Sequence, residues 1–470
     1  MTLAEARPGT GFAGLLGDRR SGRGVATAAV AVPRLDPVAL AGAALDAGLE
    51  TAAWLRPSDG LAMVGIGRAW ATEPAGDDRF RAAEAAWTEL MTGPVMDPAG
   101  PERDAGAGPV LLGGLGFLGE RAADRGPWAP FPVASLVLPS LLYRERAGGA
   151  SLTVAVAPGE DPERLESTWA SLVRAAATRV RVAGRRGRPT GVRSVPDAPG
   201  WARLVGLMSG AVGRGRLDKV VLARRVDLEL GAAADPSVVL GALAAGAPES
   251  AAFLFARGGR VFLGATPERL ARVEGQAFRT VAIAGSTRRG RDAAEDAALA
   301  AALLASDKDR EEHAIVVDEL RARLAPLASD LRVAPGPGVL ALRDLQHLVT
   351  PVEGVLRERA GILTLAGLLH PTPAVGGAPA DAALAMIAEH EGFDRGWYAG
   401  PVGWAGADGD GELMVALRSG VLDGARASLF AGCGIVADSD PGREWAESRM
   451  KLRPMLAALG LDPDDTEAVA

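Results

Sequence analysis

Three charged residues near the C-terminus share one face of an expected helix. Glu444, Glu447 and Lys451 are spaced i, i+3 and i+7, so their side chains project from the same side. A solvent-exposed face with a Glu447–Lys451 ion pair is the simplest interpretation. However, a Gly-rich segment, AGCGIVADSDPG, leads directly into this helix, and turns of that kind present backbone N–H groups to an anion. Carboxylates for a hard cation, next to donors for an anionic ligand, would form a metal–carboxylate site.

A second acidic segment, SDKDREEHAIVVDEL, spans residues 306–320. Its Glu312 falls on the same helical face as the apolar Val316 and Leu320, so this carboxylate can face inward. Surface charge is the simpler interpretation of the segment, and His313 alone indicates a packed or hydrogen-bonded histidine. Added to the two carboxylates of the C-terminal helix, Glu312 would complete a set of three, which together with water suits octahedral Mg²⁺.

Two further residues have the chemistry of a base and an acid. Lys219 opens an expected strand, KVVLARRVDLEL, where a lysine is usually an edge residue whose ammonium reaches solvent. If Lys219 is buried, desolvation or a nearby cation would lower its pKa and allow it to act as a general base. Glu268, in GATPERL, follows a strand at a turn. An exposed carboxylate is its simpler interpretation, whereas a general acid there would need a pKa raised by burial.

Other segments offer groups that bind anions. Arg418, in ELMVALRSG, is expected in a strand, where an inward arginine is costly unless it meets a carboxylate. Gly285 and Ser286, in VAIAGSTRRG, are expected in a turn that donates backbone hydrogen bonds. The segment HPTPAVGGAPADAA (370–383) indicates a rigid loop that brings backbone close to a ligand. The sequence contains no Walker loop, and its Gly-rich stretches lack the strand–GxGxxG–helix context of a nucleotide site.

Composition narrows the classes of function. The 470 residues are 48% hydrophobic and 23% charged, as in globular proteins, and a net charge of -7 gives no reason to expect nucleic acid or an anionic membrane as a partner. The single cysteine, Cys433, excludes an intrachain disulfide and, with four histidines, argues against structural zinc. The N-terminus lacks the features of a secretory leader, and no apolar run is long enough to span a membrane, so we expect a cytoplasmic protein.

The expected elements indicate how these residues are positioned. Short strand-like runs alternate with Gly/Pro loops through residues 1–180, and a basic, Gly/Pro-rich stretch ending near Gly200 indicates an exposed connection. Hairpins beside long helices then favour a mixed, largely antiparallel α+β architecture. We expect a helix over 201–217, a strand over 219–230 and a hairpin with a Gly-Gly turn over 251–265. A long helix is expected over 292–324, with a candidate interruption near Ser306. A late hairpin over 411–436 and a last helix over 444–459 follow.

Nine motifs in a fixed order carry a resemblance to a known family. They are LDKVVLARR, GATPERL, AIAGSTRRG, KDREEH, DLQHLVTPVEG, LLHPTPAVGG, FDRGWYAGPVGW, VALRSG and AGCGIVADSDPGREWAESRMK. In sequence and spacing they resemble the chorismate-utilising enzymes, which include isochorismate, salicylate, anthranilate and aminodeoxychorismate synthases. The strong resemblance runs from about residue 200 to 456, whereas the first half resembles the family only diffusely.

The resemblance implies a fold, expected here as one large α/β domain of the α+β type. Two mostly antiparallel sheets would be flanked by helices, with the site in a cleft between them. Residues 1–195 would form the N-terminal half of this domain, and residues 196–460 would form the chorismate-binding catalytic region.

The resemblance also implies roles for individual residues. Lys219 matches the lysine that activates water for attack at ring carbon 2, and Glu268 matches the acid that protonates the departing 4-hydroxyl. The cofactor would be Mg²⁺, held by Glu312, Glu444 and Glu447 and holding the ring carboxylate of chorismate. The residues that would bind the substrate are Gly285, Ser286, His347, Arg418, Gly432 and Lys451.

Within the family, two features favour isochorismate synthase. Members that use ammonia typically lack a lysine at the Lys219 position and carry a loop ending in GAPK, where this chain has Ala380 in GGAPA. Salicylate synthases keep the lysine but usually differ in the loop after the His-Pro pair. One departure is Cys433, which replaces the alanine common in the family and which we interpret as a small packed residue.

The resemblance therefore implies Mg²⁺-dependent, reversible conversion of chorismate to isochorismate. Two alternatives stay open: a salicylate synthase, which would go on to eliminate pyruvate, and a non-catalytic relative that binds a metabolite. Family members are often monomers, and a dimer is also open. The product would feed menaquinone, siderophore or salicylate-derived pathways, of which menaquinone is favoured by its prevalence in the family.

Overall fold

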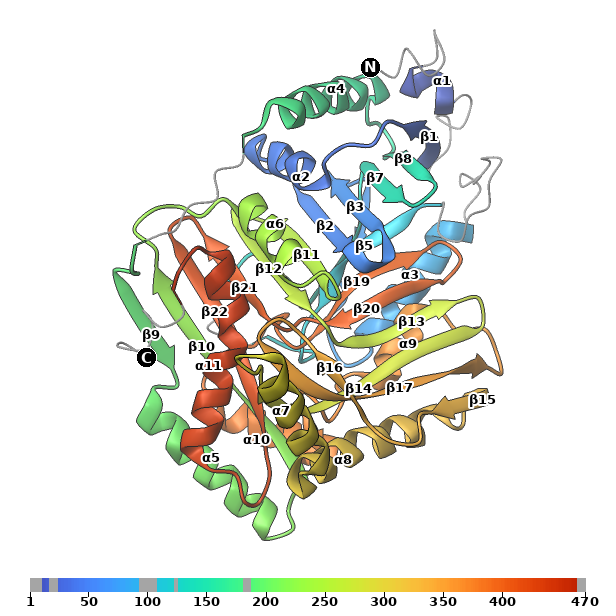
Figure 1. Cartoon of the computed structure of the whole chain (residues 1–470). Helices are drawn as coiled ribbons and strands as arrows, with labels where there is room; N and C mark the ends of the chain where they lie inside the picture. The colour runs from blue at the N-terminus through green and yellow to red at the C-terminus, as the bar shows by residue number, and fades with distance from the viewer. Residues whose placement is uncertain (1–10, 17–23, 93–107, 122–125, 181–186, 463–470) are drawn as a thin grey trace.

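A computed structural model describes residues 11–16, 24–92, 108–121, 126–180 and 187–462. Within these ranges the strands form two large sheets in which all the paired strands are antiparallel. Helices lie against both sheets (Figure 1), so the expected mixed α+β class is confirmed. Among the described helices, none is long and apolar enough to cross a membrane.

The first sheet has twelve strands among the described residues. Its order is β1 (Ala26–Val32), β8 (Gly149–Val156), β7 (Leu141–Arg146), β3 (Leu61–Ile66), β2 (Thr51–Arg56), β11 (Ala251–Arg257), β12 (Arg260–Thr266), β21 (Ser419–Asp423), β22 (Arg426–Ile435), β10 (Lys219–Glu229) and β18 (Gly377–Ala378). A further strand, β9 (Gly191–Val195), pairs with β10. The pairing of β2 with β11 joins the two halves of the chain within this sheet.

The second sheet has ten strands in the part of the chain that is described. Its order is β15 (Ala328–Val333), β17 (Leu345–Leu356), β14 (Ala277–Arg288), β13 (Arg269–Glu274), β20 (Gly411–Val415), β19 (Pro401–Gly406), β5 (Val110–Leu115), β6 (Ala134–Leu138) and β4 (Trp70–Thr72). A short strand, β16 (Gly338–Ala341), pairs with β17. The pairing of β5 with β19 joins the two halves a second time.

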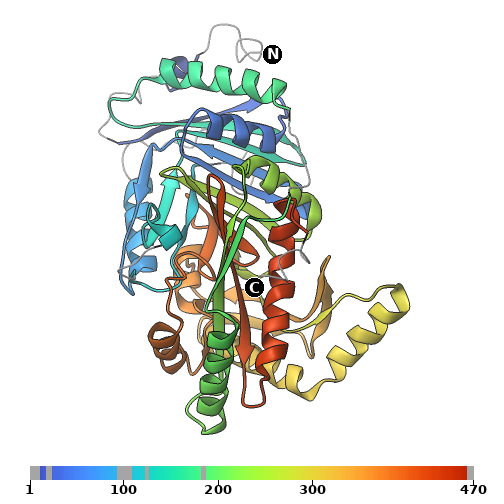
Figure 2. The ribbon, with the colours of Figure 1, turned by 90° about the vertical axis from the view of Figure 1, so that its left-hand side faces the viewer.

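Helices cover the outer faces of the sheets and each other. In Figures 1 and 2, α11 runs beside β22 and α5 on one side of the molecule, and α8, which packs against β14, lies along the lower edge of the second sheet. The α-helices are α1 (Phe12–Leu16), α2 (Pro37–Asp46), α3 (Arg79–Thr92), α4 (Pro162–Thr178), α5 (Ala198–Gly213), α6 (Pro236–Gly246), α7 (Ala293–Ala305), α8 (Asp307–Leu324), α9 (Ile362–Leu369), α10 (Ala380–His390) and α11 (Pro441–Ala458).

Local capping explains where the helices near the site begin. Ser306 caps the C-terminus of α7 and the N-terminus of α8, where its hydroxyl accepts a hydrogen bond from the backbone N–H of Asp309 in the first turn. The interruption considered for the long helix therefore falls at Ser306. Asp440 caps α11 by accepting from the N–H of Arg443, and Pro441 occupies the first helical turn, where it lacks only an N–H that would be unpaired.

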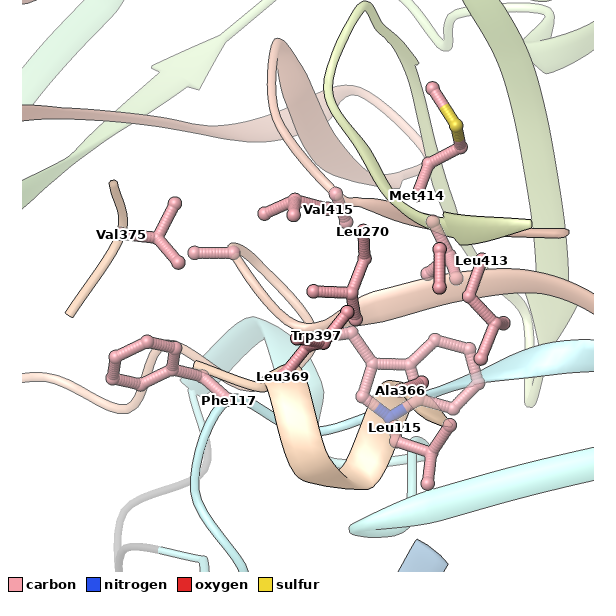
Figure 3. Close-up of a cluster of buried hydrophobic side chains, with 14 of the residues drawn as sticks. Leu115, Phe117, Leu270, Ala366, Leu369, Val375, Trp397, Leu413, Met414 and Val415 are labelled. Carbon is pink, nitrogen blue, oxygen red and sulfur yellow. The ribbon is translucent and has the colours of Figure 1, made fainter. Parts of the chain in front are cut away.

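Buried side chains from both halves hold the sheets in place. Figure 3 shows one such cluster, in which α9 presents Leu369 to side chains of the second sheet and its loops, such as Leu270, Leu413 and Trp397. Trp128, in a short 3-10 helix (Gly126–Trp128) of the first half, stacks on Phe430 of the second half with ring centroids 5.4 Å apart. This shared core fixes the strands that carry the site relative to one another.

Four local expectations are wrong. Residues 411–436 do not form one hairpin: β20 lies in the second sheet, the β21–β22 hairpin lies in the first, and Arg418 sits in the crossing between them. Gly285 and Ser286 lie within β14 at a bulge, not in a turn. The Gly-rich AGCGI is not part of a turn but belongs to β22. Glycines in a buried strand let neighbouring groups approach its backbone closely. The expected connection before Gly200 contains β9, although its residues 181–186 lie outside the described ranges.

The expectation about a secretory leader concerns a segment that is mostly undescribed. Residues 1–10 and 17–23 lie outside the described ranges, and the short helix α1 stands between them. The other strands and helices expected beyond residue 200 are confirmed, including α5, β10, the β11–β12 hairpin with its Gly258–Gly259 turn, and α11.

Candidate active site

A buried lysine–glutamate pair lies at the start of β10. Lys219 is 1% exposed, so the exposed-edge interpretation of this lysine is wrong. Its Nζ lies 2.8 Å from Oε1 of Glu312, which reaches it from α8. Although burial opposes it, the charge of Lys219 holds the pKa of Glu312 below its usual range. A side chain at Gly434 of β22 would overlap this pair, which explains why glycine occupies that position.

Glu268 is a buried carboxyl group in the connection between β12 and β13. Burial raises its pKa to about 7, against the opposing charges of Lys219, Arg418 and Lys451. Its side chain is only 4% exposed, so the exposed-turn interpretation is wrong. The same three cations act on Glu268 from three different elements, so Glu268 shares the environment of Lys219. A carboxyl group with a pKa near 7 can hold and release a proton at neutral pH.

The face of α11 that carries Glu444, Glu447 and Lys451 is turned into the protein. Burial and the neighbouring charge of Glu447 raise the pKa of Glu444 to about 7. Lys451 forms an ion pair with Oε1 of Glu447 at 2.6 Å and donates a hydrogen bond to the carbonyl of Gly432 at 2.9 Å. Although burial opposes it, Glu447 holds the pKa of Lys451 above its usual value. The pair expected from the spacing exists, but it is partly buried and not fully solvent-exposed.

Arg418, His347 and Ser286 form a hydrogen-bonded chain. An arginine can only donate, so Nε2 of His347 accepts from Arg418 at 3.2 Å and the ring proton sits on Nδ1, which faces Ser286 Oγ at 2.8 Å. Burial and the charges of Arg418 and Lys451 hold the pKa of His347 well below its usual value, so the ring is neutral. The backbone of Gly285, at the bulge with φ +77°, also bonds to this histidine.

Arg418 itself adopts a backbone conformation that is rare for a residue with a side chain. Its φ is +50°, in the left-handed region. The chain crosses between the two sheets at this point, and the carbonyl of Arg418 accepts a hydrogen bond from Ala265 of β12. Strain of this kind persists only where the surroundings impose it, and it directs a buried guanidinium toward His347.

Three residues near the cluster were not identified from the sequence. Nζ of Lys308 lies 3.5 Å from Oε1 of Glu444, and Asp309 lies against Gly285. The Tyr398 hydroxyl lies close to Gly432, and burial raises the pKa of Tyr398 to about 12 despite nearby cations that include Lys451 and Arg418. All three lie within the motifs KDREEH and FDRGWYAGPVGW, but nothing in their local spacing indicates that they face inward.

Cys433 lies beside the carboxylates of α11. It is fully buried, its thiol donates to the carbonyl of Glu444 at 3.2 Å, and burial raises its pKa well above the usual value. The interpretation as a small packed residue therefore agrees with its surroundings. His313 is likewise buried and hydrogen-bonded, with Nε2 2.7 Å from the hydroxyl of Thr350.

The acidic groups suit a hard divalent cation. Ligand atoms of Glu444, Glu447 and Cys433 lie within 4.8 Å of one another, and Glu312 is close enough to contribute to the raised pKa of Glu444. The pKa of Glu444 is raised in part by the charge of Glu447, so this pair lacks a full counter-charge, which a dication would supply. In the structure, three lysines supply positive charge to these carboxylates: Lys219 pairs with Glu312, Lys308 with Glu444 and Lys451 with Glu447.

All eleven residues singled out from the sequence are linked by these contacts and charge interactions. They come from β10, the β12–β13 connection, β14, α8, β17, the β20–β21 crossing, β22 and α11. The arrangement provides a base and an acid, cations for carboxylates, and carboxylates for a metal ion. Such a set can exchange protons on two sides of a bound dicarboxylate.

A mixed fold of two antiparallel sheets with a buried acid–base and carboxylate cluster defines this chain as an enzyme of the chorismate-utilising fold. The menaquinone-specific isochorismate synthase MenF from Escherichia coli superimposes with a TM-score of 0.76 at 27% identity, over 93% of this chain and 95% of that chain. Anthranilate synthase component I from Streptococcus pneumoniae, at 20% identity and a TM-score of 0.68 over 84% of this chain and 92% of that one, shares the fold.

The chain belongs to the chorismate binding enzyme family, whose model matches residues 15–460. It is 40% identical to the "Salicylate biosynthesis isochorismate synthase" of Pseudomonas aeruginosa, over 91% of this chain and 89% of that protein. It is also 34% identical to the "Isochorismate synthase MenF" of Bacillus subtilis, over 87% of each chain.

Proposed function

We propose that this chain is an isochorismate synthase, which adds water at ring carbon 2 of chorismate and expels the 4-hydroxyl. The names of its relatives in Pseudomonas aeruginosa and Bacillus subtilis support this assignment. The observation that carries it is the environment of Glu268, whose pKa is raised by burial to about 7 while Lys219 acts on it from β10. A proton donor and an amine in one buried cluster are what the reaction requires.

In this proposal, Lys219 takes a proton from the attacking water and Glu268 gives a proton to the departing hydroxyl. One water is added and one is released, so the ring keeps its composition and the reaction can run in both directions. Afterwards Lys219 holds one proton more and Glu268 one fewer, and exchange with solvent restores both. Glu312, 2.8 Å from Lys219, is placed to stabilise the ammonium that forms.

The carboxylates of chorismate would be held by the cations around this pair. Arg418 is oriented by the neutral ring of His347, which is itself fixed by Ser286 and the backbone of Gly285. Lys451, anchored to the carbonyl of Gly432, is a second cation of the cluster. Because these cations are already fixed and desolvated, they would bind an anion without a large reorganisation.

Mg²⁺ is the cofactor that we propose for the acidic part of the site. When bound by Glu444, Glu447 and Glu312, it would offset negative charge on the ring carboxylate and on the transition state. The hard oxygen ligands and the raised pKa of Glu444 support a site for such a cation. Lys308 would then have to leave Glu444 or share it with the metal.

Product analysis tests the proposal directly. Purified protein is incubated with chorismate and Mg²⁺, with and without chelator, and the products are separated by chromatography. We expect isochorismate in equilibrium with chorismate, and no product with the chelator. Salicylate with pyruvate would instead identify a salicylate synthase, and unchanged chorismate that still binds would identify a non-catalytic relative.

Size-exclusion chromatography of the same sample tests our expectation of a monomer. We also propose that the protein acts in the reducing cytoplasm, which its single cysteine fits.

A further inference from the structure

A separate cavity of about 150 Å³ lies beside the site. Its walls are the C-terminal end of α6, the C-terminal end of α11, the connection between β16 and β17, and Arg418. Among the described residues that line it, Arg418 alone belongs to the cluster described above.

The cavity leads from the surface to a buried floor. Ala242 of α6, Ala457 of α11 and Arg343 of the β16–β17 connection are exposed and mark its mouth. Its deeper lining is closed to solvent and includes Ala265, which is 3% exposed, and Arg418, which is 8% exposed. A molecule that enters at the mouth therefore meets Arg418 in the deeper lining.

Three wall residues are next to residues of the cluster along the chain. Pro267 directly precedes Glu268. Leu345 comes two residues before His347 on β17, and Pro454 follows Lys451 by three residues, or about one turn, on α11. The cavity and the cluster therefore share three chain segments, and Arg418 belongs to both.

The size and chemistry of the cavity match a ring that carries carboxylates and a hydroxyl. A cavity of this volume holds a six-membered ring such as benzene. Arg418 is the cationic residue of the deeper lining, and Oε1 of Glu249 in the wall is buried without a hydrogen-bond partner among the described residues. A hydroxyl group can donate to such an acceptor. At the rim, Arg343 and Asp344 carry opposite charges, so the rim itself adds no net charge.

We propose that this cavity is the entrance through which a cyclohexadiene dicarboxylate reaches the cluster, with Arg418 binding its carboxylate from the cavity side first. The inference rests on the proposed function for the identity of the ligand. It extends that function by assigning a route that lies between α6, α11 and the β16–β17 connection.

Two alanines on one helix provide a matched test. Ala242 lines the cavity, whereas Ala245, one turn further along α6, is equally exposed and does not. Ala242→Trp would place an indole, larger than a benzene ring, in the mouth, and Ala245→Trp is the control. Ala457→Trp would close the mouth from α11 instead. It provides a second test in case Ala242→Trp does not fold. For each protein we would measure kcat/KM for chorismate with Mg²⁺, the rate of chorismate association by stopped-flow tryptophan fluorescence, and Tm.

We expect Ala242→Trp and Ala457→Trp to lower kcat/KM and the association rate at least tenfold with Tm retained, and Ala245→Trp to stay within twofold of the wild type. Equal kinetics for Ala242→Trp, Ala245→Trp and the wild type would overturn the route. A wild type that binds chorismate without converting it would overturn the proposed function instead, and the association rates would still decide whether the cavity is the entrance.

Discussion

Each of the three carboxylates expected to bind a metal is paired with a lysine. Glu312 pairs with Lys219, and Glu447 pairs with Lys451, at 2.8 and 2.6 Å. The third pair, Lys308 with Glu444, is longer at 3.5 Å, and its carboxyl group keeps a raised pKa. Buried charges are tolerated only when they are compensated, so the lysines allow these carboxylates to exist inside the protein.

The role of Lys219 can be separated from its charge by Lys219→Arg. Arginine retains the positive charge that Glu312 needs, but it cannot give up its proton near neutral pH. We expect kcat to fall by about 10²–10⁴-fold, the usual contribution of a general base, while chorismate still binds. Initial rates and calorimetric titration with chorismate would measure both effects. Turnover near that of the wild type in this variant would show that Lys219 is not the base.

Glu268 makes stability depend on pH. Its pKa is about 7 in the folded protein, raised by burial from 4.5, so the folded state holds this proton more tightly than the unfolded state does. The stability linked to this proton is complete below pH ~4.5 and is lost as pH rises through ~7. Glu268→Gln mimics the protonated form, and we expect it to be more stable than the wild type by about 3 kcal/mol at pH 8. At pH 5 the difference should be small.

Urea denaturation of both proteins at the two pH values measures this difference. Glu295→Gln is a suitable control, because Glu295 is a surface carboxylate paired with arginines, whose pKa is lowered to about 2 by hydrogen bonds from Arg288 and Arg291. That change should not favour the variant at pH 8. A stability gain for Glu268→Gln that is the same at pH 5 and pH 8 would contradict the raised pKa.

At the scale of elements, α11 places the acidic residues because a buried arginine holds it in position. Arg224 of β10 is 0% exposed and lies under the ring of Trp445, 3.8 Å from its centroid. Its Nε donates to Oγ of Ser448 at 2.7 Å. Trp445 and Ser448 each follow a metal-binding candidate, Glu444 or Glu447, so these contacts set the rotation of α11 about its axis.

Ser448→Ala tests this anchor with little change in volume. The substitution removes an acceptor from a buried guanidinium, one nitrogen of which already lacks a hydrogen-bond partner among the described residues. This loss should cost about 1–3 kcal/mol of unfolding free energy. Ser209→Ala, at a half-buried serine of α5 whose hydroxyl donates to the carbonyl of Gly206 in the same helix, should be nearly neutral. Chemical denaturation measures both, and equal stability of the two variants would show that Arg224 does not depend on Ser448.

The elements also show what sequence can and cannot predict about the site. Helix spacing correctly placed Glu444, Glu447 and Lys451 on one face, because that spacing is a property of the helix alone. It left the direction of that face open, since the residues that cover it include Lys308 of α8, which is distant in sequence. Arg418 was misplaced in a strand because a crossing between two sheets leaves no periodic signal.

At the scale of the whole molecule, the N-terminal half contributes no residue to the cluster, yet it completes both sheets. β2 pairs with β11 in one sheet and β5 with β19 in the other. Trp128 of this half contacts Phe262 and Phe430, with ring centroids 4.9 and 5.4 Å away. The division at residue 195 therefore follows the strength of the family resemblance, and we propose that both parts fold as one domain.

Expression of residues 196–460 alone tests that proposal. The fragment would expose the edges of β11 and β19 and the aromatic surface that Trp128 covers, and open edges with exposed apolar surface favour aggregation. We expect a fragment that is aggregated or lacks a cooperative unfolding transition, as judged by light scattering and thermal circular dichroism. Co-expression with residues 1–195 should restore a soluble complex that binds chorismate. A fragment that is monomeric and unfolds cooperatively by itself would instead establish the catalytic region as an independent domain, with a site that needs only its own strands.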